Sequence, residues 1–210
     1  MKKLLLIGAG GHGKVVADVA EQSERWDEIL FLDEEFPKRK HNGVWSIVAT
    51  PSRAKGMFGE YRDAFVSIGD AEARMRWIAK LMDWGYEIPT LIHPRSVVSR
   101  YARIDKGSVV MPLACINAGA RLGKGVIVNT SATVDHDCVV EDGVHLAPGV
   151  HLSGDVQVGE GAWLGTGASC IQGLRVGAGA MVGAGATVIR DIPDRVTAVG
   201  TPARLLGGDE

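Results

Sequence analysis

Residues 103–192 decide the fold, and they read RIDKGS VVMPLA CINAGA RLGKGV IVNTSA TVDHDC VVEDGV HLAPGV HLSGDV QVGEGA WLGTGA SCIQGL RVGAGA MVGAGA TVIRDI. These are fifteen consecutive six-residue units (hexads) without an insertion. The second position is aliphatic in every hexad except one, where it is Cys170. The sixth position is always Ser, Ala, Cys or aliphatic, and residues 97–102 (VVSRYA) extend the frame by one more hexad.

A period of six fits neither an α-helix, with 3.6 residues per turn, nor a single amphipathic strand, with a period of two. It predicts a solenoid of short strands joined by tight corners. The second-position residues point inward, and the small sixth-position residues fill the corners. Glycine is frequent in the third and fifth positions, where we expect unusual backbone dihedrals. Such coils bury a core by stacking on one another, at about 4.8 Å per strand.

Composition excludes several classes of protein. The 210 residues carry 23 Lys and Arg against 25 Asp and Glu, so no basic surplus exists to neutralise nucleic-acid phosphates. No apolar run is long enough to cross a bilayer as a helix, so we expect no insertion into a membrane. The apolar start at residues 1–7 lacks the cleavage site of a signal peptide. Three scattered cysteines predict no disulfide framework and a reducing, cytoplasmic location.

The first half of the chain differs from the repeat, since ten of the 12 aromatic residues precede residue 97 and nineteen of the 28 glycines follow it. We therefore predict two domains, residues 1–94 and residues 95–210, the second with a C-terminal tail. The first reads as a small Rossmann-like α/β domain. Its expected strands cover residues 2–7, 28–33, 64–69 and 87–92, and its expected helices cover residues 14–22 and 71–84.

A glycine-rich turn follows the first expected strand. Gly8, Gly10 and Gly13 satisfy the G-x-G-x-x-G pattern, and Asp33 ends the second expected strand, where a ribose-binding acid would sit. A helix N-terminus after this turn could hold phosphates. An NAD(P) oxidoreductase is one interpretation, although about 90 residues supply one nucleotide-binding half. A second interpretation is that the glycines only make a tight strand–helix turn. Lys14 does not complete a P-loop, because G-x-x-x-x-G-K-[ST] is absent.

Two motifs together carry a family resemblance: GAGGHGKVVADVA at residues 8–20 and NTSATVDHDCVVEDGVHLAPG at residues 129–149. Over essentially the whole chain, the sequence resembles the hexapeptide-repeat sugar acetyltransferases. These act on UDP-, GDP- or dTDP-linked 4-amino sugars or on sialic acid. The resemblance implies a left-handed parallel β-helix with three hexads per coil, acetyl-CoA as co-substrate, and a homotrimer with active sites between neighbouring subunits.

The function that this resemblance implies is acetyl-CoA-dependent N-acetylation of a nucleotide-linked 4-amino-deoxy sugar. An alternative within the family is O-acetylation of sialic acid. A third hypothesis is a non-enzymatic binding protein, which would bind its ligand tightly without releasing coenzyme A. Residues 103–192 would remain unexplained if the protein were an NAD(P) oxidoreductase.

The hexad TVDHDC contains the expected catalytic pair. The reaction needs a base to take the proton of the attacking amine, and a histidine can do so near neutral pH. A carboxylate on the other imidazole nitrogen fixes the tautomer. The resemblance assigns these roles to His136 and Asp137, although Asp135 could replace Asp137, and a corner histidine could simply bond the backbone. The amine attacks the thioester directly, so Cys138 is expected in the core rather than as a nucleophile.

The resemblance also implies the binding residues. For the nucleotide sugar they are Gly11, His12 and Gly13 at the phosphates, Asp33 and Glu34 at the base or ribose, Gly69 in the base pocket, and Asn129 near the reacting sugar. For acetyl-CoA they are His145 near the thioester, Gly165, Thr166, Gly183 and Ala184 along the pantetheine arm, and Arg190 and Arg204 at the phosphates, unless these two are ordinary surface arginines. His151 is expected on the surface. His136 occupies a different hexad position from His145 and His151, so we expect no metal site.

Overall fold

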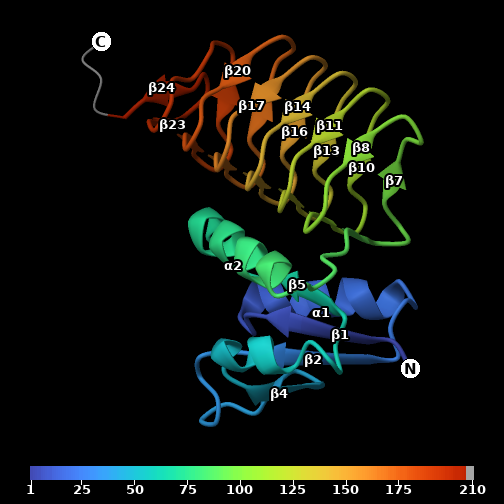
Figure 1. Ribbon diagram of the computed structural model, residues 1–210. Coiled ribbons are helices and arrows are strands. Elements are labelled where there is room, and N and C mark those ends of the chain that lie inside the picture. Colours follow the sequence, from blue (N-terminus) through green and yellow to red (C-terminus); the bar gives the residue numbers. More distant parts are fainter. Residues whose placement is uncertain (207–210) are drawn as a thin grey trace. The chain divides into compact units, whose positions relative to one another are not determined.

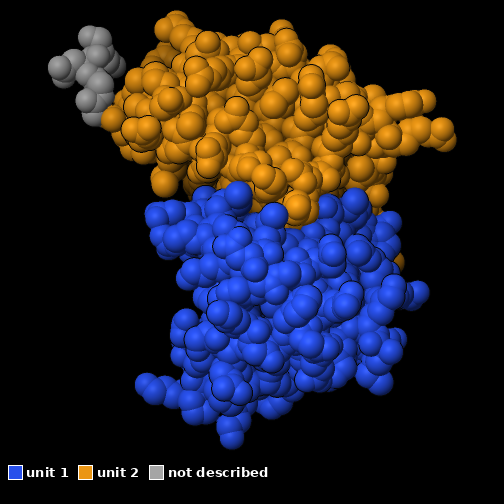
Figure 2. Space-filling model, in the orientation of Figure 1, with its two compact units in different colours: residues 1–94 blue, residues 95–210 orange. Residues whose placement is uncertain are grey.

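The structure is a computed structural model, and it describes residues 1–206 of the chain. The chain divides into two compact units, residues 1–94 and residues 95–210 (Figure 2). The predicted second domain therefore includes four residues, 207–210, that lie outside the described ones.

A five-stranded sheet with the strand order β3-β4-β2-β1-β5 forms the centre of the first unit. Four of its strands are parallel, and β3 runs antiparallel to β4 at the edge. The apolar run LLLI fills β1, and each of its four side chains is fully buried, as expected for a central strand covered on both faces. The strands are β1 (Lys3–Ile7), β2 (Glu28–Leu32), β3 (His41–Asn42), β4 (Trp45–Ala49) and β5 (Asp63–Val66).

Three helices cover this sheet: α1 (Gly11–Gln22), the 3-10 helix η1 (Pro51–Gly56) and α2 (Ala71–Asp83). Leu5 and Ile7 of β1 share one hydrophobic core with residues of η1 and α2. Leu4 and Leu6 point to the opposite face by strand alternation, and α1 contacts β1 and β2. The topology is that of one Rossmann-like half, with the glycine turn between β1 and α1 (Figure 1).

The structure corrects several details predicted for this unit. The strand expected at residues 87–92 is reduced to an isolated bridge from Glu87 to Asp63 and the two-residue β6 (Leu91–Ile92). Strands β3 and β4 and helix η1 were not predicted. Within α2, Arg74, Ile78 and Leu81 are buried, whereas Ala79 and Met82 are exposed.

The second unit is a parallel β-helix (Figure 1). The bounds of its strands agree with the predicted hexad frame to the residue. Each hexad contributes a two-residue strand on its first two positions, and each strand pairs with the strand three hexads further on. Three hexads therefore make one coil. The strands are β7 (Val97–Val98), β8 (Arg103–Ile104), β9 (Val109–Val110), β10 (Cys115–Ile116), β11 (Arg121–Leu122), β12 (Ile127–Val128), β13 (Thr133–Val134), β14 (Val139–Val140), β15 (His145–Leu146), β16 (His151–Leu152), β17 (Gln157–Val158), β18 (Trp163–Leu164), β19 (Ser169–Cys170), β20 (Arg175–Val176), β21 (Met181–Val182), β22 (Thr187–Val188), β23 (Thr197–Val199) and β24 (Arg204–Leu205).

The strands form three sheets, one on each side of the coil. One contains β7, β10, β13, β16, β19 and β22, and a second contains β8, β11, β14, β17 and β20. The third runs from β9 through β12, β15, β18 and β21 to β23 and β24. Every second-position residue from Val110 to Val188 is buried, whereas Ile104 near the open end is half-buried.

The glycines of the repeat serve two different purposes. Fifth-position residues from Gly107 to Gly185 have a positive φ, including the non-glycine residues Leu113, Ser131, Asp137 and Asp155, so the expected unusual dihedral is confirmed there. Asp191, in the last hexad, is the exception. Third-position glycines such as Gly165 do not adopt a positive φ, so the dihedral explanation is wrong for them. A Cβ on Gly165 would lie 2.6 Å from the backbone nitrogen of Ala184 in the next coil. A side chain at these positions would collide with the next coil, so glycine is needed for the coils to stack closely.

Among residues 1–206, no helix is long and apolar enough to cross a membrane. Cys115, Cys138 and Cys170 are free thiols, and the last two are buried.

Candidate active site

His136 and Asp137 lie at a corner of the β-helix, between β13 and β14. The Nδ1 atom of His136 is 2.9 Å from Oδ2 of Asp137. Both side chains are largely exposed, at 62% and 68%. A carboxylate on Nδ1 keeps the proton there and leaves Nε2 as the nitrogen that can accept a proton from a substrate.

Local backbone geometry explains this pairing of adjacent residues. Asp137 occupies the fifth hexad position and has a φ of 61°, in the left-handed region that glycine fills in most other hexads. Aspartate tolerates this region better than most residues. In this conformation the Asp137 carboxylate reaches the ring of the preceding residue.

Asp135, the alternative orienting residue, is engaged elsewhere. Its Oδ1 atom accepts a hydrogen bond of 2.8 Å from the backbone N–H of His136 and another of 2.8 Å from Nδ2 of Asn117. These hydrogen bonds lower the pKa of Asp135. The structure therefore brings the His136 ring to Asp137, and it directs Asp135 to the backbone.

The carboxylates raise the pKa of His136 above its ordinary value. The largest cause is the hydrogen bond that His136 Nδ1–H donates to the Asp137 carboxylate, followed by the negative charge of Asp135, with a smaller contribution from Asp155. The same arrangement stabilises an imidazolium after proton uptake. Cys138, in contrast, has a buried thiol that donates to the carbonyl of Ser153 at 3.1 Å, and burial raises its pKa. This fits a core residue.

Two rows of corner residues flank the sheet that contains β13. The dyad row follows this sheet along the chain and contains the fourth-position residues His136, Gly154, Gln172 and Arg190, one from each successive coil. The glycine row precedes the sheet and contains two predicted pairs in successive coils, Gly165–Thr166 and Gly183–Ala184. These rows lie on opposite edges of one sheet.

The predicted acetyl-CoA residues divide between these two rows. His145 lies on β15, in the sheet that leads into the glycine row, and its Nε2 atom is 3.3 Å from Nδ2 of Asn129. His145 also packs edge-on against Trp163, with ring centroids 6.4 Å apart. Arg204, on β24, belongs to the same sheet, whereas Arg190 belongs to the dyad row. The structure thus brings Asn129 and His145 together and separates them from His136 by the width of a sheet.

A hollow of about 400 Å³ lies in the first unit at the glycine turn. Five of the predicted nucleotide residues line it: Gly11, His12, Asp33, Glu34 and Gly69. Gly13 does not, because its Cα packs against the strand. A Cβ there would lie 2.3 Å from the carbonyl oxygen of Gly8, so Gly13 serves the close approach of α1 to β1.

Asp33 and two residues after β2 hold the glycine turn in place. The Ala9 N–H donates to Oδ2 of Asp33 at 2.6 Å, and Oδ1 of Asp33 is 3.4 Å from Nη2 of Arg39. Arg39 also donates to the carbonyl of Ala9 at 2.5 Å, and Asn42 donates to the carbonyl of Gly10 at 3.1 Å. These bonds fix the turn that precedes the first N–H groups of α1, which lack partners within the helix.

His12 is an uncharged group in this hollow. Burial, and secondarily the positive charge of Arg74, lower the pKa of His12 to about 4. At neutral pH the side chain is therefore neutral, and its ring can donate or accept a hydrogen bond but adds no positive charge.

Several residues of this site were not predicted, and they include the following four. Arg39 and Asn42 hold the turn, and Pro51 and Trp77 line the hollow. Trp77 does not stand out in the sequence, because its neighbours Met75 and Ile78 are also apolar. Arg39 and Asn42 lie in a segment without hydrophobic periodicity, and no pattern marks them.

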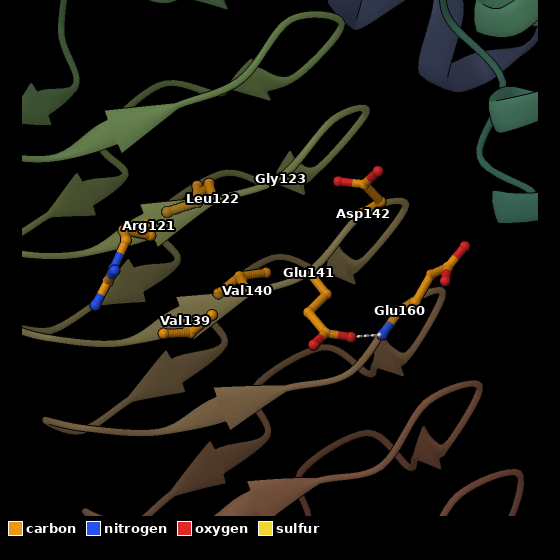
Figure 3. Close-up of a pocket in the computed structure, with 8 residues that line it drawn as sticks. All are labelled: Arg121, Leu122, Gly123, Val139, Val140, Glu141, Asp142 and Glu160. Atoms are coloured by element: carbon orange, nitrogen blue, oxygen red, sulfur yellow. Dashed lines mark hydrogen bonds between the residues drawn. The ribbon is translucent and has the colours of Figure 1, made fainter.

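A second hollow, of about 420 Å³, lies on the sheet that contains β11 and β14 (Figure 3). Two of its acidic side chains accept hydrogen bonds from the backbone of neighbouring coils. Glu141 accepts from the N–H of Glu160 at 2.9 Å, and Asp142 accepts from the N–H of Lys124 at 2.7 Å. Arg121 lies at the other end of the hollow (Figure 3). None of the predicted site residues lines it. Within residues 1–206, no group of three or more His, Cys, Asp or Glu side chains could hold a metal ion.

Comparison with known proteins identifies a matching family and several relatives of this chain. Residues 3–81 match the family of the PglD N-terminal domain. A UDP-N-acetylbacillosamine N-acetyltransferase from Bacillus subtilis (strain 168) is 39% identical over 113 residues. That alignment covers 53% of this chain and 52% of the relative, so the match spans about half of the relative's length.

Two solved structures match nearly the whole chain. One is the acetyltransferase domain of PglB from Neisseria gonorrhoeae FA1090 in complex with acetyl coenzyme A, with 43% identity, a TM-score of 0.95, and coverage of 98% of this chain and 99% of that chain. The other is PerB from Caulobacter crescentus in complex with CoA and GDP-perosamine, with 36% identity, a TM-score of 0.94, and coverage of 99% and 98%. These matches confirm the predicted fold class, a small Rossmann-like domain followed by a left-handed β-helix. The chain belongs to the hexapeptide-repeat sugar acetyltransferases, whose co-substrate is acetyl-CoA.

Proposed function

We propose that this chain transfers the acetyl group of acetyl-CoA to the amino group of a nucleotide-linked 4-amino-deoxy sugar, with His136 as the general base. The observation that carries this proposal is the 2.9 Å contact between His136 Nδ1 and the Asp137 carboxylate at an open corner. The names of the relatives favour N-acetylation, since one is a UDP-N-acetylbacillosamine N-acetyltransferase and another binds GDP-perosamine. They do not support the alternative of sialic acid O-acetylation.

The chemistry follows from the state of the dyad. The amine nitrogen of the sugar attacks the thioester carbonyl carbon, so a C–N bond forms as the C–S bond breaks. His136 Nε2 takes the proton that the amine loses, and Asp137 stabilises the imidazolium. The imidazolium then returns this proton to the departing thiolate of coenzyme A. Direct transfer needs no acyl-enzyme, in agreement with the burial of Cys138.

The nucleotide sugar is assigned to the hollow of the first unit. Gly11, His12 and Gly13 begin α1, where N–H groups and the helix dipole favour phosphate. Asp33 and Glu34 line the same hollow, together with Gly69 and Trp77. Because both oxygens of Asp33 hold the protein backbone or Arg39, we infer that Glu34 has the freer carboxylate for the base or ribose.

We infer that the working form is a homotrimer in which two subunits share each site. Asn129 and His145 contact each other on one edge of a sheet, and His136 lies on the other edge. One chain therefore cannot place all three around one acetyl group, but adjacent chains can. The acetyl-CoA residues of the glycine row, Gly165, Thr166, Gly183 and Ala184, would then face the dyad of the neighbouring subunit.

The first test measures thiol release from acetyl-CoA with UDP-, GDP- and dTDP-linked 4-amino sugars and with free sialic acid. We expect turnover on one nucleotide-linked amino sugar and its loss in His136→Ala. Turnover on sialic acid alone would instead establish an O-acetyltransferase. An absence of turnover on every acceptor, in a protein that binds acetyl-CoA, would contradict the proposed acceptor class.

The three cysteines are free thiols, which fits a protein that works in a reducing compartment such as the cytoplasm.

A further inference from the structure

The fourth hexad position carries a side chain in every hexad from residue 97 to residue 192 except one. The exception is Gly154, in the coil after His136. The other members of the position include charged, polar and small residues, namely Arg100, Lys106, Pro112, Ala118, Lys124, Thr130, His136, Asp142, Pro148, Glu160, Thr166, Gln172, Ala178, Ala184 and Arg190. The corner geometry therefore accepts many kinds of side chain at this position.

The backbone conformation at residue 154 does not require a glycine. Its φ lies outside the left-handed region, unlike that of the fifth-position glycines. Nor does the next coil crowd it, as happens to the third-position Gly165. A Cβ on Gly154 would instead lie 2.5 Å from both Cε1 and Nε2 of the His136 ring. The three atoms nearest to this Cβ position all belong to that ring.

We propose that Gly154 is a positioning residue for catalysis: its missing side chain leaves the space in which the His136 imidazole lies while Nδ1 bonds to Asp137. This inference rests on the proposed role of His136 as the base. Any side chain at residue 154 would push the ring away from this orientation. The main chain could remain in place, because the obstructed group is a rotatable, largely exposed side chain.

A second glycine contacts the dyad but is less informative. A Cβ on Gly119 would lie 2.4 Å from Oδ1 of Asp137, so the carboxylate also lies against a glycine, in the preceding coil. However, Gly119 has a φ of 80°, which an alanine would adopt only with strain. A substitution there would change the corner itself, so Gly154 gives the cleaner test.

The test compares Gly154→Ala with wild type, with His136→Ala and with Gln172→Ala, an exposed control one coil further along the dyad row. We expect Gly154→Ala to lower kcat about a hundredfold, the effect of moving a catalytic group by roughly 1 Å. The KM for acetyl-CoA should change less than twofold, and Gln172→Ala should behave as wild type. Retention of kcat within about twofold in Gly154→Ala would overturn the proposal.

Two readouts do not depend on turnover. The first is NMR titration of the His136 ring, identified by the signal that His136→Ala lacks. Asp137, Asp135 and Asp155 are the charged groups that act on this ring. A ring displaced from Asp137 loses the largest of these influences, so its pKa should fall in Gly154→Ala. An unchanged pKa would contradict the proposal.

The second readout is a double-mutant cycle on the thermal midpoint. Any loss of midpoint caused by Gly154→Ala should disappear when His136 is already alanine, because the obstructed ring is gone. An equal loss in both backgrounds would show that the backbone, not His136, needs the glycine. These two readouts decide the role of Gly154 even if the acceptor panel shows no turnover. Activity retained in His136→Ala would contradict the role of His136 as the base and, with it, the catalytic role of Gly154. The pKa and the double-mutant cycle would still show whether Gly154 positions the His136 ring.

Discussion

The dyad row and the glycine row flank one sheet and are built on the same hexad, yet they depart from the repeat in opposite ways. The dyad row places polar residues in corner positions, with Asp137 in a left-handed conformation that glycine fills in most hexads. The glycine row removes side chains at its third position, so that successive coils approach closely. One edge of the sheet therefore carries polar side chains, and the other edge carries positions that lack a side chain. A single repeat can supply both surfaces when its corners differ.

Replacing the base should have the largest effect. His136→Ala removes the proton acceptor, so kcat should fall about 10²- to 10⁴-fold. The thermal midpoint should be nearly unchanged, because the side chain is largely exposed. His151→Ala is the matched control, since His151 is also exposed and bonds Thr133 in a neighbouring coil of the same sheet. Equal losses in both variants would remove the distinction between the dyad and an ordinary surface histidine.

Mixing subunits tests whether the two rows work together across chains. The His136→Ala and His145→Ala variants should each be weakly active alone. In the proposed homotrimer, protein co-expressed from both genes should regain about one quarter of wild-type activity, because a quarter of random neighbouring pairs supply both intact rows. The measurement is specific activity of purified mixed trimers against each parent. Activity no higher than that of the parents would place both histidines in one chain's site.

The two aspartates beside His136, Asp135 and Asp137, should differ in their effect on the pH profile. A general base works when unprotonated, so activity falls as the pH drops through the pKa of His136, which Asp137 raises. Asp137→Asn should therefore move the acid limb of kcat/KM to lower pH and reduce kcat about ten- to a hundredfold. Asp135→Asn should move the limb less, because Asp135 is directed to the backbone. A larger shift from Asp135→Asn would reverse their roles.

The smallest of these effects concerns stability in the glycine row. The methyl group of Gly165→Ala would press on the backbone of residues 182–184, and overpacking of this kind costs about 1–3 kcal/mol. Gly154→Ala in the dyad row should cost clearly less, since it meets a movable ring. Urea denaturation of both variants measures the difference. A larger cost at Gly154 would show that both rows need glycine for the same reason.

The β-helix could be predicted residue by residue because its period is visible without knowing which strands pair. The hexad frame predicted the buried second positions correctly. The pairing of His136 with Asp137 came from the family resemblance, because the residues alone left Asp135 as an alternative. Strands β3 and β4 escaped prediction because His41–Asn42 is too short for a pattern, and β4 is mostly half-buried and lacks clear alternation. Arg39 and Asn42 escaped for another reason: their partners Ala9 and Gly10 lie 30 and 32 residues away in the chain. Proximity created by folding leaves no local pattern.

Because each coil contains three hexads, residues at equivalent positions of the second unit are separated by a fixed distance per coil. Residues in one row are spaced by whole coils, so Arg190 lies three coils, or roughly 14 Å, from His136. Deleting or inserting one complete coil between them would change this separation by about 4.8 Å without altering the frame of any hexad. The separation of two residues in one row can therefore change only by whole coils, and the chain could be re-engineered for acyl carriers of different length by adding or removing them.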